Sequence, residues 1–474
     1  MNEALSAKIM IGHKLKRLRK ELGISQAAMA TELGISGSYL NLLENNMRPV
    51  TVQLLFKLGQ TYDIDLKDMA EDESAQITAR LTEIFADPLL LEQALSRRDI
   101  QQLAQNQPAA ANAIMAIYDS YETMKSVAQQ GNEGIESKAL PRPIETVRRF
   151  LEQSGNHFPS LEDAADACRK SANIMPGQSF TNLCHYLEEQ YGLRPRIMPA
   201  HVMGNMLRHH DFHRSQLMLS EILEEPQRLF QLASQIALIG HQDTIQAIID
   251  QSDIIDNEAR QLLQIALAGY FAGAVMMPYD SFLRSAQETR HDIDLLCKRF
   301  SASFEQVCHR LTTLNRPNAK GIPFFFLRVD EAGYISKRLS GAGVEFARHG
   351  GACGRWIPHQ AFRVPGTIHV QCAELEEGQK LFTLARTVVQ PRTGPRHYGT
   401  PLFVVALGCD LKHAKDIALA DPLITAKTPT ITPIGLGCQL CERTACQHRG
   451  APPIGRALRF DSYRRQSGLF DFGS

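Results

Sequence analysis

Residues 24–51 read ISQAAMATELGISGSYLNLLENNMRPVT, and this stretch decides the fold of the N-terminal part of the chain. Ser25 is placed to cap a helix that starts at Gln26, since a serine hydroxyl can accept a hydrogen bond from a free amide in the first helical turn. Gly34 supplies a tight turn, and Ser36 is placed to cap a second helix over 37–44. The stretch therefore predicts two short helices joined by a glycine turn.

The second of these helices has a polar outer face. Leu40 and Leu43 are predicted to point inward, whereas Ser38, Tyr39 and Asn41 point outward. Hydroxyl and amide groups on such a helix suit the base edges of the DNA major groove. The helix that precedes residue 24 is basic, with six Lys or Arg and no acidic residue between positions 8 and 20, as a phosphate-binding patch requires.

The order of these features over residues 9–66 resembles the phage-repressor-like helix-turn-helix family. The resemblance implies a double-stranded DNA operator as partner and a homodimer or higher homo-oligomer as the binding form. The alternative, a helical bundle that binds protein, would leave the basic helix without a role. The candidate DNA-contacting residues are Lys14, Arg17, Gln26, Ser36, Ser38, Tyr39, Asn41 and Arg48.

The rest of the chain is organised in three further segments. Residues 73–142 are predicted to form a helical arm followed by a linker at 129–142, where Gly and Pro gather. Residues 143–312 have mostly helical periodicity, with strand-like pieces at 194–197 and 216–220. In 313–474 the runs PFFFLRVD, YISKRLS, TIHVQCAEL and LFVVALGCD predict strands. The expected fold class is an α+β multidomain protein with an all-α helix-turn-helix domain (1–72), a mostly helical domain and a C-terminal α+β domain with a cysteine-rich loop.

The sequence RLFQLASQIALIG (228–240), followed by LAGYFAGAVMMPYD (267–280), resembles the repressor-cleaving metallopeptidase family. That family has F-x-L-A-H-E-L-G-H and, downstream, E-A-N-x-F-A-x-x-L-L-M-P. Here Ser234, Gln235, Leu238 and Leu267 stand where the resemblance puts two histidine ligands, the general base and a glutamate. Zinc hydrolysis needs three lone-pair donors and a base, and leucine offers neither. We therefore expect this domain to bind no catalytic metal and the protein not to be an enzyme.

The combination of these domains with a cysteine-bearing C-terminal domain resembles the short-chain fatty acyl-CoA regulator family. The resemblance covers almost the whole chain and implies a transcription factor for propionate- or acetate-type metabolism that senses coenzyme A or acyl-CoA. Coenzyme A requires fixed cations and an apolar tunnel. Arg316 and Lys320 bracket a proline turn, Gly321 frees the backbone beside them, and Tyr270 and Tyr279 lie on the apolar helical stretch; ordinary loop cations are the competing interpretation.

The segment GCQLCERTAC places Cys438, Cys441 and Cys446 in C-x2-C-x4-C spacing. Three thiols this close indicate a metal site in a reducing compartment, either a four-thiolate zinc or an iron–sulfur cluster. The acyl-CoA regulator resemblance implies a [4Fe–4S] cluster rather than zinc. We expect Cys409 as the fourth ligand, with Cys372 and Cys353 as alternatives, whereas Cys168, Cys184, Cys297 and Cys308 fall in helical patterns that suit a core.

The chain has 474 residues and no net charge, with 51 Lys and Arg against 51 Asp and Glu, so DNA affinity must come from local patches. We expect a cytoplasmic protein without a membrane partner, because no apolar run approaches the length of a membrane span. A second arginine-rich stretch, from Arg443 to Arg465, is either a solvated face or a binding surface. The rival function is a redox- or iron-sensing transcription factor that has no acyl-CoA ligand.

Overall fold

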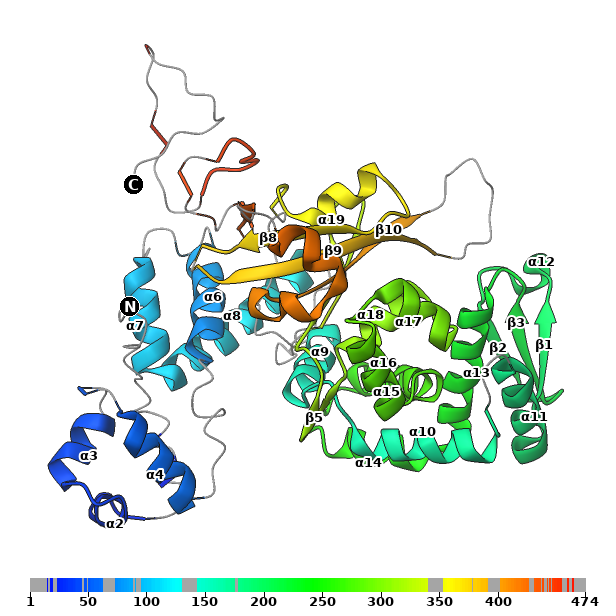
Figure 1. Cartoon of the computed structure of the whole chain (residues 1–474), viewed down its shortest axis with the longest axis horizontal. Coiled ribbons are helices and arrows are strands. Elements are labelled where there is room, and N and C mark those ends of the chain that lie inside the picture. Colours follow the sequence, from blue (N-terminus) through cyan, green and yellow to red (C-terminus); the bar gives the residue numbers. More distant parts are fainter. Residues whose placement is uncertain are drawn as a thin grey trace. The chain divides into compact units, whose positions relative to one another are not determined.

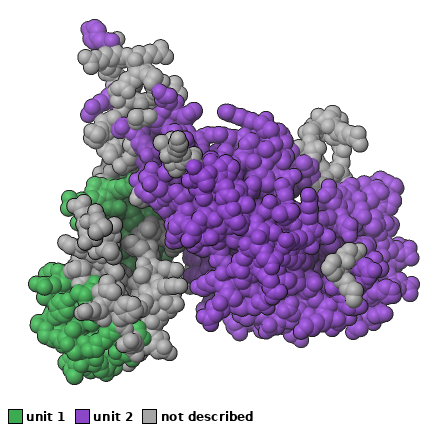
Figure 2. All heavy atoms as spheres, viewed as in Figure 1, with its two compact units in different colours: residues 1–122 green, residues 123–474 purple. Residues whose placement is uncertain are grey.

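In the computed structural model the chain divides into two compact units, residues 1–122 and 123–474 (Figure 2). The residues that the structure describes are 15, 18–19, 24–44, 47–48, 50–62, 73–87, 90, 95–129, 143–174, 178–339, 353–376, 378–390, 401–425, 430–435, 437–438, 441, 443–444, 446–453, 458–459 and 463.

The N-terminal part of the first unit has the predicted helix-turn-helix. Ser25 accepts a hydrogen bond from the Ala28 amide, and Ser36 accepts one from the Tyr39 amide, both at 3.1 Å. Gly34 has φ +61°, the left-handed conformation that the turn requires. The described helices are α2 (Gln26–Glu32), α3 (Gly37–Glu44) and α4 (Val52–Tyr62), around a core of Leu15, Met29, Ala30, Leu33, Leu40, Leu43, Val50, Leu54 and Leu58.

The predicted helical arm consists of α6 (Glu73–Phe85), α7 (Arg97–Asn106) and α8 (Pro108–Gln129). Ser96 and Asp99 form a capping box at the start of α7, which fixes where that helix begins. The three helices enclose a small core of their own, made by Leu81, Ile84, Ile100, Ala104 and Ala111. The predicted linker lies outside the described residues, apart from Gln129 at the end of α8.

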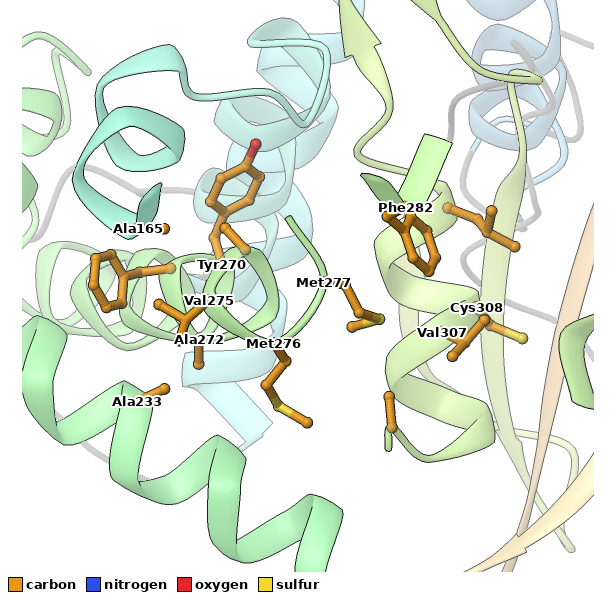
Figure 3. Packing of buried hydrophobic residues seen from close by; sticks show 14 of the residues in the cluster. Ala165, Ala233, Tyr270, Ala272, Val275, Met276, Met277, Phe282, Val307 and Cys308 are labelled. Carbon is orange, nitrogen blue, oxygen red and sulfur yellow. The ribbon is translucent and has the colours of Figure 1, made fainter. Parts of the chain in front are cut away.

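The second unit begins with a helical body built around α15 (Asn257–Met276), which packs against α9, α10, α13, α14 and α18 (Figure 1). Figure 3 shows part of its core, with Tyr270, Met276, Phe282 and Val307 among the buried side chains. No single helix among the described residues is long and apolar enough to span a membrane. Only α15 and α16 (Tyr279–Glu288) taken together reach that length and apolar composition, and they are bent by 64° at the break between them. The other helices are α9 (Pro143–Gln153), α10 (Pro159–Ser171), α11 (Ser179–Tyr191), α13 (Glu225–Gly240), α14 (Gln242–Asp250), α16 (Tyr279–Glu288), α17 (Ile293–Phe300) and α18 (Phe304–Leu311).

A small three-stranded sheet interrupts the helices where the sequence predicted two strands. It contains β1 (Arg194–Met198), β2 (Arg208–Asp211) and β3 (Gln216–Ser220), in the order β1-β3-β2. The short α12 (Ala200–Met203) follows β1. The strand β2 was not predicted, since RHHD has neither the alternation nor the β-branched residues that mark a strand.

The C-terminal part forms a six-stranded sheet in the order β11-β8-β9-β10-β6-β7. One face packs on the helical body through Phe382 and Val405, and the other carries Trp356 and Ile357. The four predicted strands are present, whereas β9 and the short β11 were missed. The strand β9 gave no signal because it is buried on both faces and its sequence does not alternate between polar and apolar residues. The strands are β6 (Phe325–Asp330), β7 (Ile335–Leu339), β8 (His369–Glu374), β9 (Lys380–Val389), β10 (Leu402–Asp410) and β11 (Ile431–Pro433), with the helical segments α19 (Ile357–Gln360), η2 (Ala361–Arg363), η4 (Leu411–Asp416), η5 (Ala418–Ala420) and α20 (Asp421–Ile424).

A turn after α16 fastens the helical body to the segment that follows β10. Arg290 and His291 both have positive φ, 50° and 56°, which costs non-glycine residues conformational energy. Arg290 makes a bidentate ion pair with Asp421 at 2.6 and 2.7 Å, and His291 Nδ1 lies 3.0 Å from the Asp416 carbonyl oxygen. The buried core and this turn together explain why residues 123–474 form one compact unit.

Candidate functional site

The outer face of α3 carries exposed Ser38 and Asn41, as predicted for a helix that reads DNA, and exposed Arg48 follows it. Tyr39 differs from the prediction, because it is half-buried and packs against the core of this domain. Ser36 caps α3 and its hydroxyl lies 3.1 Å from that of Ser38. Lys14 and Arg17 lie outside the described residues.

Glu44, at the end of α3, is buried and accepts hydrogen bonds from polar side chains of this domain. It is 5% exposed and accepts hydrogen bonds from Arg19 at 2.6 and 3.1 Å and from the Gln26 amide at 3.1 Å. Gln26 Nε2 also lies 3.4 Å from Asn41 Oδ1. The first turn of α2 and the helix α3 are thereby joined at Gln26 and Asn41, two positions that the sequence singled out. Sequence reasoning did not find Glu44, although its place three residues after Asn41 on a helix was a usable signal.

We expect Asn41→Ala or Ser38→Ala to reduce discrimination among DNA sequences, because a contact to a base edge is worth about 1–3 kcal/mol. Replacing Lys14 or Arg17 should weaken binding to all sequences and lower its salt dependence. The measurement is a binding-site selection from random DNA, with the exposed Thr31→Ala on α2 as control. An unchanged selection profile for Asn41→Ala would remove α3 from the recognition role.

The four residues at the zinc-ligand and general-base positions of a metallopeptidase lie in or against the packed core of the helical body. Ser234 is 7% exposed and donates to the Phe230 carbonyl at 2.7 Å, and Gln235 Nε2 lies 3.3 Å from His210 Nδ1. Leu267 is fully buried, and Leu238 packs partly buried against the same core. This face of α13 and α15 therefore offers no set of ligands for a catalytic zinc.

A hairpin after α18 carries the two predicted cations. It consists of β4 (Asn315–Arg316) and β5 (Ala319–Lys320). Tyr279 closes the hairpin, because its hydroxyl donates to the Ala319 carbonyl at 2.9 Å and accepts from the Arg316 amide at 2.8 Å. The Arg316 guanidinium lies 4.0 Å from the centre of the Tyr279 ring and 2.8 Å from Asp280. Lys320 is exposed.

Gly321 has a packing role in this structure. A Cβ atom there would stand 2.9 Å from Cβ of Leu314, and its amide donates to the Leu314 carbonyl at 2.8 Å. The absence of a side chain is thus required by the close approach of two backbone segments. Its predicted part in ligand binding stays a prediction.

Beneath the hairpin lies a buried polar network that the sequence did not reveal. Arg310, 2% exposed, makes a bidentate ion pair with Glu162 at 2.7 and 2.8 Å and donates to the Met277 carbonyl. Tyr270 donates to Glu162 at 2.5 Å, and Arg310 lies 5.8 and 5.7 Å from the ring centres of Tyr270 and Tyr279. Arg310 and its partner Glu162 are 148 positions apart in the sequence. Arg310 lies next to the rings of Tyr270 and Tyr279, and Tyr279 in turn contacts Arg316.

Burial and charge oppose each other in this network. Burial would raise the pKa of Glu162, but the Arg310 guanidinium and the Tyr270 hydroxyl outweigh it and hold that pKa below its usual value. Burial lowers the pKa of His157, whose Nδ1 lies 3.2 Å from the Tyr270 hydroxyl. The network therefore keeps Glu162 charged and His157 neutral near pH 7.

The three clustered cysteines lie in one segment, residues 435–449, which we call the cysteine loop. The loop is fastened to the end of β8, where the Arg443 side chain donates to the Glu374 carbonyl at 3.1 Å. Gly435 packs directly on Cys441, since a Cβ atom there would stand 3.0 Å from its Sγ. Burial raises the pKa of the Cys441 thiol to about 11.

The chemistry of this donor set fits a soft metal, because three thiols within nine residues of sequence are the ligands that zinc and iron–sulfur clusters take. Within the described parts of the chain, no three Cys, His, Asp or Glu side chains already converge in metal-binding geometry. The loop would therefore have to close around an ion.

The candidates for a fourth thiol lie on different faces of the sheet. Cys409, on β10, and Cys372, on β8, belong to the core that faces the helical body. Cys353 belongs to the opposite core, together with Ile434, which directly precedes the cysteine loop. Cys353 therefore lies on the same face of the sheet as the residue that leads into the cysteine loop, whereas Cys409, the residue preferred from sequence, lies on the other face.

A helix-turn-helix with a polar, exposed second helix, joined to a large second unit, defines the class of DNA-binding transcriptional regulators. Three family models match the chain: helix-turn-helix at 15–69, IrrE N-terminal-like domain at 188–312, and short-chain fatty acyl coenzyme A regulator, C-terminal, at 313–470.

Relatives match over nearly the whole chain. HTH-type transcriptional regulator PrpR of Mycobacterium tuberculosis is 35% identical over 95% of this chain and 93% of that protein. Propionyl-CoA carboxylase regulator of Cereibacter sphaeroides is 36% identical over 97% and 98%. A solved structure, described as a Mycobacterium tuberculosis transcriptional regulator, matches with a TM-score of 0.65 and 36% identity over 70% of this chain and 100% of that one. The chain belongs to the family of short-chain fatty acyl coenzyme A regulators and is a transcriptional regulator, not an enzyme.

Proposed function

We propose that this protein is an effector-responsive regulator that binds a short-chain acyl-CoA in its second unit and changes its affinity for an operator in response. The target genes would serve propionate- or acetate-type acyl-CoA metabolism, in line with the printed names of the family and of its relatives. The helix-turn-helix supplies the DNA contacts and the second unit supplies the effector site.

The observation that supports the effector site best is the β4–β5 hairpin. It presents Arg316 and Lys320 on a short loop whose backbone is fixed by Tyr279, so two cations stand near each other where anionic groups can reach them. Arg316 is one-third exposed and its partner Asp280 is two-thirds exposed, so a phosphate can replace that carboxylate. Tyr270 and Tyr279 lie beneath the hairpin, where their hydroxyls are bound to Glu162 and to the hairpin backbone, so the acyl-pantetheine arm would bind beside their rings against the apolar side chains of α15 and α16.

We expect Arg316→Ala and Lys320→Ala each to weaken propionyl-CoA binding about tenfold or more, because each removes a charge-assisted contact to phosphate. Isothermal titration calorimetry on the full chain measures this. Arg299→Ala, which removes another exposed arginine of the same unit, is the matched control. If both hairpin variants bind propionyl-CoA as tightly as the parent protein, the hairpin is not the phosphate site.

The cysteine loop is proposed to hold a [4Fe–4S] cluster, with zinc as the alternative. Cys438, Cys441 and Cys446 would be ligands, and Cys353, which shares a face of the sheet with Ile434, would be the fourth in place of Cys409, the residue expected from sequence. A cluster bound by four cysteines has no open position for chemistry, so its role here would be to order the loop against the sheet.

The operator-binding form is proposed to be a homodimer that reads a near-palindromic operator with half-sites about one helical turn apart. The arm helix α8 presents Ile117, 70% exposed, together with exposed Ala113 and Ala116, and these apolar groups suit contact with a second copy. A rival function, redox or iron sensing without acyl-CoA, is distinguished by calorimetry, since it predicts no heat of binding with propionyl-CoA.

A further inference from the structure

Arg449 is part of the arginine-rich stretch that could have been a solvated face, yet it is only 4% exposed. Its guanidinium donates hydrogen bonds to the carbonyl oxygens of Cys438, Cys441 and Arg443, each at 2.8 Å. A longer contact of 3.3 Å reaches the carbonyl of Ala451. One side chain thus bonds to the backbone at three described positions of the cysteine loop.

The geometry of these contacts depends on the shape of the arginine side chain. A guanidinium is planar and presents its donors as a rigid fork, so it can reach several acceptors in fixed directions, whereas a lysine ammonium acts as a point charge. Two of the three acceptors at 2.8 Å are the carbonyls of Cys438 and Cys441, the two residues of the C-x2-C pair. The Arg449 amide also donates to the Cys446 carbonyl at 3.4 Å. All three cysteines are therefore tied to Arg449 through their backbone.

Gly435 limits the loop from the other side. Its backbone lies so close to Cys441 that an added Cβ atom would stand 2.9 Å from the Cβ atom and 3.0 Å from the Sγ atom of that cysteine. Cys441 is therefore held between the Gly435 backbone and the Arg449 guanidinium. A loop held in this way loses less conformational entropy when its thiols close around an ion.

We propose that Arg449 is the positioning residue of the metal site in the cysteine loop. It holds the backbone of Cys438, Cys441 and Cys446 together, so that less of the backbone has to be fixed when their thiolates close around one metal centre. Its positive charge also offsets the negative charge of a thiolate-bound centre. This inference rests on the proposed metal site and adds the residue that builds it.

The test uses Co²⁺ as the probe, titrated anaerobically into the full-length, metal-free protein and followed by thiolate-to-cobalt absorption. Residues that orient metal ligands typically contribute about 10- to 100-fold to metal affinity. We expect Arg449→Met, Arg449→Lys and Gly435→Ala to weaken Co²⁺ binding within that range. Arg459→Met, which removes an exposed arginine of the same tail, should leave Co²⁺ binding unchanged.

Hydrogen exchange of the metal-free proteins separates positioning from general unfolding. The amides at 437–449 should exchange faster in Arg449→Lys and Arg449→Met, while those of β8–β10 should keep their protection. If Arg449→Lys binds Co²⁺ as the parent does, charge alone suffices and the proposed fork geometry is wrong. If the parent protein binds no Co²⁺ and also contains no iron or zinc after anaerobic purification, the metal site of the proposed function fails, and the positioning role fails with it. If it binds no Co²⁺ but is brown, the iron retained per chain is compared in the same variants, and an unchanged iron content in Arg449→Met overturns the positioning role.

Discussion

Arg310→Met should destabilise the second unit by about 3–5 kcal/mol, because it leaves the buried Glu162 carboxylate without its partner. The ion pair lies between α10 and α18 with side-chain exposures of 5% and 2%, so water cannot replace the lost guanidinium. The variant also loses the hydrogen bonds that the guanidinium donates to the Met277 carbonyl and to the Thr313 hydroxyl. A single substitution therefore removes the buried hydrogen bonds that join three separate segments of the helical body.

Urea unfolding followed by tryptophan fluorescence measures this loss. The chain has one tryptophan, Trp356, which is buried in the C-terminal sheet, so the signal reports the second unit alone. The double variant Glu162→Gln, Arg310→Met should recover part of the stability, since it removes the buried charge. Arg299→Met, which breaks an exposed ion pair, should cost less than about 1 kcal/mol. An Arg310→Met loss no larger than this control would contradict the account of the network.

The pair also predicts a pH dependence. Glu162 has a folded-state pKa below its unfolded value of about 4, so its contribution to stability is complete above that pH and disappears as the pH falls through the folded-state pKa. In Arg310→Met the desolvated carboxyl should instead have a raised pKa. That variant should therefore gain stability, relative to the parent protein, as the pH is lowered from 7 to about 5.

Replacing Cys438, Cys441 or Cys446 with Ser should abolish metal binding by the cysteine loop. A metal corner that loses one thiolate is open to water and oxidant, so the centre should not survive purification. Protein purified without oxygen should be brown and contain more iron than zinc, and each variant should be colourless. Iron, sulfide and zinc analysis per chain provides the measurement, and Cys184→Ser, on the distant α11, is the matched control.

The fourth ligand can be decided in the same assay. Cys353→Ser should lose the colour, whereas Cys409→Ser and Cys372→Ser should keep it, because those two thiols face the helical body. Loss of colour in Cys409→Ser alone would restore the choice made from sequence. Colourless parent protein with one equivalent of zinc would contradict the iron assignment and leave the structural role in place.

The helix-turn-helix could be predicted almost residue by residue, because its signals are local. Ser25, Gly34 and Ser36 each act on the turn in which they stand, and Leu40 and Leu43 follow the helical period. Tyr39 was misjudged because an aromatic ring at the edge of a small core can pack partly inward from a position that the period places outside.

The effector region and the cysteine loop were predicted less completely, since their contacts join distant parts of the sequence. Glu162 and Arg310 gave no signal of pairing, although Arg310 follows the buried Val307 by three residues and so falls on a buried helical face. Arg449 looked like one of several surface arginines, and its partners are backbone carbonyls, which a sequence does not distinguish. The face on which Cys409 and Cys372 lie depends on the register of the sheet, and β9, which pairs with both of their strands, was itself missed.

The central claim is that effector binding in the second unit changes operator affinity. Fluorescence anisotropy tests it directly, with the full-length protein titrated into an operator selected from random DNA, in the presence and absence of saturating propionyl-CoA. Coupling between two sites typically amounts to about 1–3 kcal/mol, so the account predicts a change in Kd of about 5- to 150-fold, with no change when coenzyme-free propionate is added instead. An operator Kd that is the same with and without propionyl-CoA would contradict it.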